Sequence, residues 1–187
     1  MNEEEGTVEE AGDRLVLRFE RRFSHPVERV WQALTDPEQV QRWVGASELE
    51  LELVEGGRFY SRTSAPELVE AVLHEHPEID APEIRERGFE SNDIVLRVEP
   101  RRVFEHTFGA PESVVRWELA EDGDGCRLRL THTQPPGASR SDASRDLAGW
   151  HTLLELLAEV LEGRPDVAWS RPRWQKIVSY YRGKESP

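Results

Sequence analysis

The feature that most constrains the fold of this chain is a series of strand-like segments followed by one long amphipathic helix. Each segment carries apolar side chains at every second position, as a strand with one buried face does. The segments are residues 14–23, 48–55, 58–60, 93–99, 102–108, 113–120 and 127–133. The helix runs from about Ser141 to Glu162, with Trp150 and several leucines three and four residues apart. Since an antiparallel sheet with one apolar face needs a cover, the sequence predicts an α+β fold in which this helix packs on the sheet.

Two short helices are predicted between the first two strand-like segments. The first begins at Pro26, where the missing N–H costs nothing, and places Trp31 on an apolar stripe. The second begins at Asp36 and Pro37, a capping residue followed by a proline, and ends at Gly45. The predicted order is therefore strand, two short helices, a run of antiparallel strands and a long helix.

Composition divides the chain into a body and three additions. Residues 1–13 hold six acidic residues and no basic one, so we predict a disordered acidic tail. One domain spans residues 14–163, and residues 164–187 form a C-terminal extension with a short helix. Within the domain, residues 64–93 break the strand pattern, with helical spacing in two short stretches and nine acidic residues against two arginines. We expect this insertion to act as a lid or binding loop.

The charge and cysteine content exclude several classes of protein. The net charge of −13 argues against nucleic-acid binding, which depends on Lys and Arg neutralising phosphates. No segment approaches the roughly 18 apolar residues of a membrane span, and the acidic start is unlike a secretory signal. We therefore expect a cytoplasmic location. The single cysteine, Cys126, can form neither an internal disulfide nor a zinc site alone.

Several motifs occur in the order in which one known superfamily carries them. They are residues 26–38 (PVERVWQALTDPE), Trp43, 55–59 (EGGRF), 98–102 (VEPRR), 115–119 (VRWEL), 130–133 (LTHT) and 149–150 (GW). In this order they resemble the START-like SRPBCC superfamily, and within it bacterial proteins similar to the C-terminal domain of the heat-shock chaperone ATPase activator. The resemblance covers about residues 19–163. It implies a helix-grip fold, in which a curved sheet and the long helix enclose an apolar cavity.

The sequence departs from the superfamily pattern in two places, of which the first bears on the entrance of that cavity. The insertion at residues 64–93 is longer than the corresponding connection in most relatives, and Val44 stands where many carry a second aromatic residue. An acidic flap near the cavity mouth is expected to disfavour anionic ligands.

The chain holds six tryptophans, and these large side chains point to a wide apolar core or a cavity. Trp117 lies on the apolar face of a strand, and Trp150 lies on the helix stripe that faces it. Trp31 is expected to pack in the core, and Trp43 and Phe59 fit either core or cavity wall. Gly149 removes a side chain in mid-helix, which indicates close approach of the backbone to the sheet or to a ligand. The candidate ligand-binding residues are Trp43, Phe59, Phe89, His106, Trp117, His132, Trp150 and Leu154.

Catalytic and metal-binding patterns are weak. His106 and His132 lie on inward strand faces, where each fits a core histidine with satisfied hydrogen bonds, a ligand contact or a general base. The six histidines show no metal-ligand spacing, and Cys126 follows a turn without a basic neighbour in space that the sequence alone guarantees, so an activated thiolate is not expected. We therefore assign no catalytic residue, no metal and no cofactor.

The leading hypothesis is non-catalytic binding of a hydrophobic small molecule between the sheet and the long helix. One alternative from the same superfamily is a polyketide cyclase or aromatase-like enzyme with His132 as acid or base. Another is an antibiotic self-resistance protein that sequesters its ligand. A chaperone-partner role ranks below these, because the eukaryotic activators carry a further chaperone-binding domain. A homodimer remains open.

Overall fold

The computed structural model describes residues 5–75, 81–164 and 166–183. These residues form an eight-stranded antiparallel sheet in the order β1-β2-β8-β7-β6-β5-β4-β3, together with six helices. The strands are β1 (Thr7–Ala11), β2 (Arg14–Phe23), β3 (Glu48–Leu51), β4 (Arg58–Thr63), β5 (Phe89–Glu99), β6 (Val103–Thr107), β7 (Val114–Asp122) and β8 (Gly125–Thr133). The helices are α1 (Val27–Thr35), α2 (Pro37–Val44), α3 (Pro66–Glu75), α4 (Pro82–Arg87), α5 (Arg140–Leu161) and α6 (Arg171–Gly183). The predicted α+β fold is confirmed.

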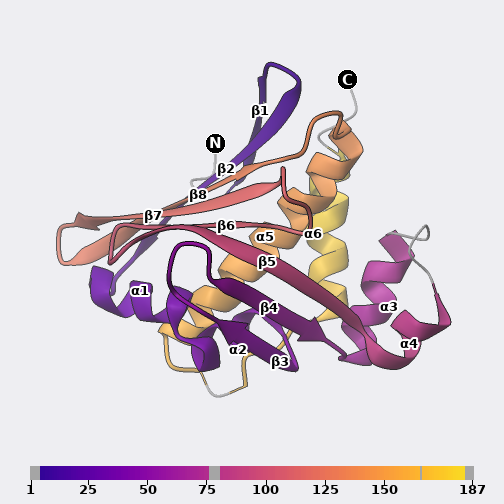
Figure 1. The fold of residues 1–187 in the computed structure, drawn as a ribbon, viewed down its shortest axis with the longest axis horizontal. Helices are drawn as coiled ribbons and strands as arrows, with labels where there is room; N and C mark the ends of the chain where they lie inside the picture. Colours follow the sequence, from indigo (N-terminus) through magenta and orange to yellow (C-terminus); the bar gives the residue numbers. More distant parts are fainter. Residues whose placement is uncertain (1–4, 76–80, 165, 184–187) are drawn as a thin grey trace.

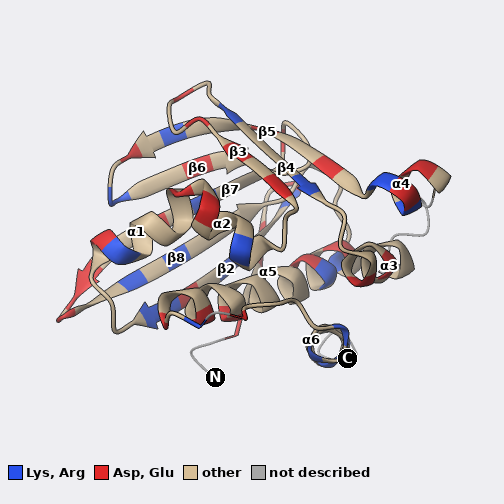
Figure 2. Ribbon diagram, turned by 90° about the horizontal axis from the view of Figure 1, so that it is seen from below, with Lys and Arg blue, Asp and Glu red and all other residues tan. Residues whose placement is uncertain are grey.

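The long helix α5 runs along one side of the twisted sheet (Figure 1). Helices α1 and α2 lie near its C-terminal end, and α3 lies at the opposite end of the molecule (Figure 2). Helix α6 packs on α5 on the side away from the sheet and also contacts α3. The elements therefore form three layers, with α5 between the sheet and α6. None of the helices in the described ranges is long and apolar enough to cross a bilayer.

Local sequence signals set the ends of the helices that hold the cavity. The Asp36 carboxylate accepts the Glu38 and Gln39 backbone N–H groups at 3.0 and 3.2 Å, which caps α2 as predicted. At the start of α5, Ser139 and Asp142 form a capping box, in which each side chain accepts the other's backbone N–H. The capping box satisfies backbone N–H groups in the first turn and so fixes where α5 begins.

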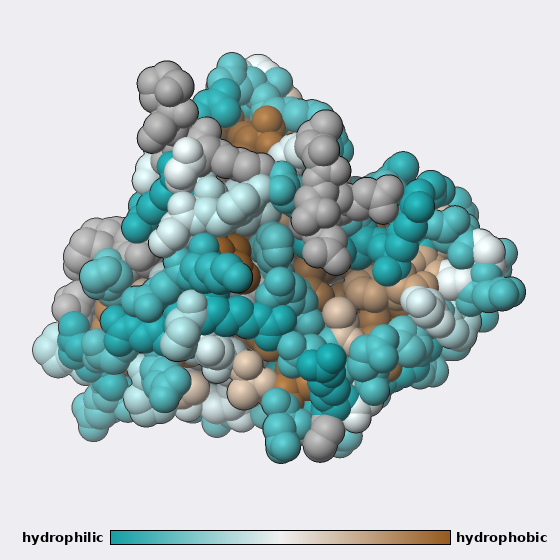
Figure 3. Space-filling view, turned by 180° about the vertical axis from the view of Figure 1, so that it is seen from behind, coloured by the Kyte–Doolittle hydropathy of each residue, from teal (hydrophilic) through white to brown (hydrophobic). Residues whose placement is uncertain are grey.

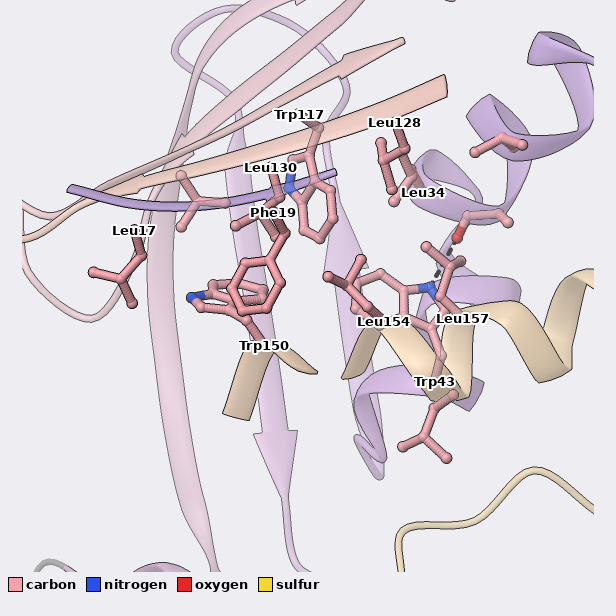
Figure 4. Close-up of a cluster of buried hydrophobic side chains, with 14 of the residues drawn as sticks. Leu17, Phe19, Leu34, Trp43, Trp117, Leu128, Leu130, Trp150, Leu154 and Leu157 are labelled. Atoms are coloured by element: carbon pink, nitrogen blue, oxygen red, sulfur yellow. Dashed lines mark hydrogen bonds between the residues drawn. The ribbon is translucent and has the colours of Figure 1, made fainter. Parts of the chain in front are cut away.

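The hydrophobic core lies between the central strands and α5 (Figure 4). Leu17, Trp117 and Leu128 point down from the sheet, and Trp150 and Leu157 point up from the helix; all are nearly fully buried. The Trp117 and Trp150 rings meet edge to face with centroids 5.6 Å apart, an arrangement that aromatic pairs prefer. The alternation and the helical stripe therefore predict the facing residues of the core correctly.

The N-terminal segment differs from the predicted disordered tail. Thr7–Ala11 forms β1, which pairs antiparallel with β2 after a tight turn at Gly12, whose φ of 67° favours glycine. The strand buries little, and surface ion pairs such as Glu9–Arg18 (2.9 Å) flank its backbone ladder. The prediction is wrong for this strand because an edge strand is held by backbone hydrogen bonds and needs no buried face. Residues 1–4 of the predicted tail lie outside the described residues.

The insertion is shorter than predicted at one end. Residues 89–93 already belong to β5, which pairs with β4 from Thr63↔Phe89 onward. The two helical stretches predicted within it are present as α3 and α4. The strand predicted over residues 48–55 ends at Leu51, because the chain then turns, with the Gly57 N–H donating to the Val54 carbonyl at 2.9 Å. The insertion proper is therefore residues 64–88.

Helix α6 confirms the short helix predicted in the C-terminal extension. Arg173 holds it to α5 through ion pairs with Glu155 (2.6 Å) and Glu159 (2.8 Å). Tyr181 is buried, and its hydroxyl interacts with Nδ1 of His151 and accepts the Gly6 backbone N–H, both at 2.9 Å. One side chain thus joins α6, α5 and the N-terminal segment.

We expect the substitution Tyr181→Phe to lower the free energy of unfolding by about 1–2 kcal/mol, because a buried N–H and a ring nitrogen lose their partner. Urea denaturation followed by circular dichroism measures this change. Tyr180→Phe, on an exposed neighbour in the same helix, is the matched control and should change stability by less than about 0.5 kcal/mol. Equal effects of the two substitutions would contradict the joining role of Tyr181.

Candidate functional site

A cavity of about 340 Å³ lies between the sheet, α5 and the three helices α2, α3 and α6. Strands β3 to β7 supply one wall, and α5 supplies the opposite wall. The lining is mainly aromatic and aliphatic. Seen from behind, the surface is mostly hydrophilic, and hydrophobic side chains show in recesses between rows of hydrophilic ones (Figure 3). The volume falls in the range of small-molecule sites, about 300–1,000 Å³.

Edge-to-face aromatic contacts join the residues of the cavity walls. Trp117 contacts Trp43 at a centroid distance of 5.9 Å and Trp150 at 5.6 Å. Phe59 contacts His106 edge to face at 4.9 Å. The indole N–H of Trp43 donates to the Ala33 carbonyl at 2.9 Å, so this ring is held by a hydrogen bond as well as by packing. These rings present apolar surface at fixed positions.

His106 orients Trp117, and both of its ring nitrogens are engaged in hydrogen bonds. Its Nδ1 lies 2.6 Å from the Thr107 carbonyl and therefore carries the hydrogen, while Nε2 accepts the Trp117 indole N–H at 3.2 Å. Burial lowers the pKa of His106 to about 4, so the ring is neutral at physiological pH. Because both ring nitrogens already have hydrogen-bond partners, His106 contributes only the faces of its neutral ring to the cavity wall.

His132 makes the same arrangement with Trp150. Its Nδ1 accepts the Trp150 indole N–H at 3.0 Å, and Nε2 lies 2.8 Å from Ser113 Oγ. Burial, with a smaller contribution from nearby His106, lowers the pKa of His132 to about 4. The rings of Phe108 and Trp150 pack edge to face against it at 5.3 and 5.9 Å. His132 therefore lies behind the cavity wall.

Gly149 faces the cavity from α5. A Cβ added at this position would meet nothing within 4 Å, and the residue lines the cavity. The backbone is therefore not in close approach to the sheet, which corrects one of the two explanations offered for this glycine. The remaining explanation is that Gly149 leaves space for a ligand.

The insertion and the C-terminal extension both contribute to the cavity wall. Leu68 and Val72 of α3 line the cavity, as do Trp169, just before α6, and Trp174, in its first turn. The two tryptophan rings lie 5.9 Å apart. Two segments that are far apart in the sequence thus close the same cavity.

Asp93 is a buried carboxylate in the wall opposite α5. Three donors reach it: the Ser91 hydroxyl, the Thr107 hydroxyl at 3.1 Å and the Gly109 backbone N–H at 2.9 Å. These hydrogen bonds hold the loop after β6, which carries Phe108, against β5. The carboxylate thus fixes one side of the cavity.

We expect Asp93→Ala to lower the free energy of unfolding by about 2–3 kcal/mol, since several buried donors would lose a charged acceptor. Chemical denaturation in urea measures the loss. Asp93→Asn keeps one carbonyl acceptor and should lose less. A loss below about 0.5 kcal/mol for the alanine variant would show that the loop is held by other contacts.

Six of the eight predicted ligand-binding residues line the cavity. They are Trp43, Phe59, Phe89, His106, Trp117 and Trp150. His132 and Leu154 do not: His132 is covered by aromatic rings, and Leu154 lies in the packed core cluster (Figure 4). Both residues lie on the same inward face as lining residues. The periodicity of a strand or helix identifies that face, but it does not tell a residue at the cavity surface from one packed behind it.

Several lining residues were not predicted. They include Arg145 and Phe108 as well as the residues of α3 and α6. Arg145 lies four residues before Gly149, so helical spacing could have placed it on the same face. Trp169 and Trp174 had only their residue type as a signal, because their packing depends on how the extension folds back.

The thiol of Cys126 is not activated as a nucleophile in this structure. Cys126 is buried, and burial raises the pKa of its thiol to about 11, so it is protonated at neutral pH. In the part of the chain that the structure describes, no group of three or more His, Cys, Asp or Glu residues is placed to hold a metal ion.

A comparison of the sequence with protein-family models identifies the family of this chain. The family model described as Activator of Hsp90 ATPase homolog 1-like protein matches residues 24–162, from the end of β2 through α5. The chain belongs to this family. The predicted resemblance to the START-like SRPBCC superfamily is confirmed, and the matched residues contain most of the cavity wall. Among curated proteins, none shows significant similarity to the chain.

Solved structures of similar proteins share the fold of this family member. EF2215 from Enterococcus faecalis, a conserved protein of unknown function, has a TM-score of 0.70 at 19% identity, over 97% of this chain and 90% of that one. BPP1335 from Bordetella parapertussis has a TM-score of 0.65 at 29% identity, over 97% and 90%. CalU16 from Micromonospora echinospora has a TM-score of 0.62 at 24% identity, over 96% and 93%. DynU16, from the dynemicin biosynthetic locus, has a TM-score of 0.60 at 24% identity, over 83% of this chain and 49% of that one.

Proposed function

We propose that this protein binds a hydrophobic small molecule, without catalysis, in the cavity between the sheet and α5. The observation that carries the proposal is the cavity itself, of about 340 Å³ and walled by Trp43, Phe59, Trp117 and Trp150. Burial of apolar ligand surface against these rings supplies about 25 cal/mol for each Å² removed from water. The surface that lines the space is mainly apolar, which is typical of small-molecule sites.

The state of the two histidines favours binding over acid–base catalysis. A general base needs a lone pair within reach of the substrate and a pKa near the working pH. The lone pairs of His106 and His132 both accept indole N–H groups, and burial lowers both pKa values to about 4. His132 is therefore poorly suited to act as the acid or base that the cyclase or aromatase alternative assigns to it.

Sequestration of a biosynthetic product is the second candidate function. It is favoured by the similarity to DynU16, a protein in the dynemicin biosynthetic locus. Sequestration and simple binding use the same cavity and differ in the identity of the ligand. The family name refers to activation of a chaperone ATPase. We rank that role lower, because the cavity indicates a small-molecule ligand and does not by itself indicate a protein partner.

Titration with phenylnaphthylamine, a neutral fluorophore whose emission rises in apolar surroundings, tests the proposal. We expect saturable fluorescence enhancement together with quenching of tryptophan emission, because the cavity is walled by indole rings. At about a hundredfold excess over the dissociation constant, the melting temperature should rise by roughly 5–10 °C. If neither this probe nor a panel of neutral aromatic and lipid-like compounds binds saturably or changes the melting temperature, the proposal fails.

A further inference from the structure

Four polar residues interrupt the apolar lining of the cavity on strands β4 and β5. Every second residue of these strands lines the cavity, namely Phe59, Ser61 and Thr63 on β4 and Phe89, Ser91 and Asp93 on β5. The register places Ser61 directly opposite Ser91, and both are partly exposed. A polar side chain on an inward face is unfavourable unless it has a hydrogen-bond partner, so the partners of these side chains decide what the wall can bind.

The hydrogen of the Ser91 hydroxyl is committed to Asp93. A carboxylate can only accept hydrogen bonds, so the Ser91 hydroxyl donates to it. The Thr107 hydroxyl and the Gly109 backbone N–H donate to the same carboxylate, at 3.1 and 2.9 Å. Ser91 Oγ therefore offers the cavity its lone pairs but no hydrogen.

The Ser61 hydroxyl is an unused donor opposite this acceptor. It hydrogen-bonds to no other residue in the described part of the chain, and its oxygen is not among the fully buried atoms that lack a partner, so it remains accessible. Directly opposed residues of an antiparallel pair have Cβ atoms about 4.5–5.5 Å apart. A single ligand atom in the cavity can therefore contact both Ser61 and Ser91.

The surroundings of this serine pair favour an uncharged group. The Asp93 carboxylate lies beside Ser91 and would repel a ligand anion. A ligand cation would have to leave water for a mainly apolar space, where Asp93 already accepts three hydrogen bonds. A hydroxyl group carries a donor and an acceptor on one atom without charge.

We propose that the ligand carries a neutral hydroxyl group, which donates its hydrogen to Ser91 Oγ and accepts the hydrogen of the Ser61 hydroxyl. This inference rests on the proposed binding function and names the chemical class of the ligand, an apolar alcohol or phenol. Donation to Ser91 is strengthened because Ser91 donates in turn to Asp93, and hydrogen bonds in a chain polarise one another. The apolar body of the ligand lies against the rings that line the rest of the cavity, such as Trp117 and Trp150.

Displacement of phenylnaphthylamine by two naphthalene derivatives tests this assignment. Naphthol carries a hydroxyl group, whereas methoxynaphthalene, substituted at the same ring position, has an ether oxygen that accepts but cannot donate. We expect naphthol to bind the wild-type protein about tenfold more tightly, although the ether is the more apolar compound. This comparison uses the wild-type protein and does not depend on the stability of a variant.

Two serine variants assign the ligand hydroxyl to its partners. Ser91→Val removes the acceptor and fills its place with methyl groups, so the affinities for naphthol and methoxynaphthalene should become nearly equal. Ser61→Ala removes a hydroxyl without a partner in the protein, so it should leave the melting temperature unchanged and lower the naphthol affinity about fivefold. Ser179, exposed on α6, is the matched control, and its valine and alanine variants should bind as the wild type does.

Equal affinities of naphthol and methoxynaphthalene for the wild-type protein overturn the hydroxyl assignment alone. An unchanged affinity ratio in Ser91→Val, or wild-type affinity for naphthol in Ser61→Ala, also overturns it. Tighter binding of the anionic naphthoate than of naphthol has the same consequence. If phenylnaphthylamine and both naphthalene derivatives fail to bind the wild-type protein, the proposed function fails together with this inference.

Discussion

The substitution Gly149→Leu should lower the affinity for phenylnaphthylamine at least tenfold without lowering the melting temperature. The new side chain enters open space on the cavity side of α5, where an added Cβ meets nothing within 4 Å. We therefore expect the leucine side chain to take up ligand volume in the cavity that Gly149 lines. A tenfold loss corresponds to about 1.4 kcal/mol of binding free energy. Fluorescence titration and differential scanning fluorimetry on the same sample measure the two effects.

Two control variants separate cavity filling from changes in the helix. Gly149→Ala adds only a methyl group and should raise the free energy of unfolding by up to about 1 kcal/mol, since glycine is unfavourable in a helix interior. Its affinity for the probe should fall less than that of the leucine variant. Gly183→Leu, at the exposed end of α6 with open space around it, should leave binding unchanged. Wild-type affinity in Gly149→Leu would mean that the probe binds elsewhere.

Acid should unfold this protein steeply between pH 6.5 and pH 4. His106 and His132 have folded-state pKa values of about 4, below the usual 6.5, so only the unfolded chain gains these protons as the pH falls through this window. The stability that both histidines contribute is fully present above pH 6.5 and is lost as the pH approaches 4. Each histidine accounts for about 3 kcal/mol. Urea denaturation at a series of pH values should give a slope of about 2–3 kcal/mol per pH unit near pH 5.

Two substitutions test whether these histidines cause the acid sensitivity. His106→Gln and His132→Asn each retain an oxygen that can accept the indole N–H, and each removes one titrating group. Either variant should lower the slope near pH 5 by about 1.4 kcal/mol per pH unit, whatever its stability at neutral pH. Unchanged slopes in both core variants would show that the buried rings are protonated in the folded state.

The fold was predictable because its elements carry local periodic signals. The alternation around Trp117 and the stripe around Trp150 each indicate a buried face, and one sheet with one long helix leaves few ways to pair those faces. Strand β1 was missed because its residues are polar, and its stability comes from a backbone ladder that leaves no trace in hydropathy. The Gly12-Asp13 pair before β2 was an available turn signal.

The residues of the cavity wall were predictable only in part, because the sequence does not show how deeply each inward side chain is packed. Periodicity identifies an inward face but not the depth of a side chain on it, so Trp150 at the wall and His132 behind it look alike in sequence. The contributions of Leu68 and Trp174 depend on how an insertion and an extension fold back over the body. Gly149 carried the clearest local signal, because a glycine in mid-helix is unfavourable unless its missing side chain leaves useful space.

The position of a bound probe tests the central claim most directly. The account predicts intermolecular nuclear Overhauser effects between phenylnaphthylamine and the side chains of Trp43, Trp117 and Trp150 in isotope-labelled protein. Ile94 and Leu96, exposed on β5, provide the alternative apolar surface. Overhauser effects to the three tryptophans at saturating probe would establish the cavity as the binding site. Effects confined to Ile94, Leu96 or other residues outside the cavity would contradict the account.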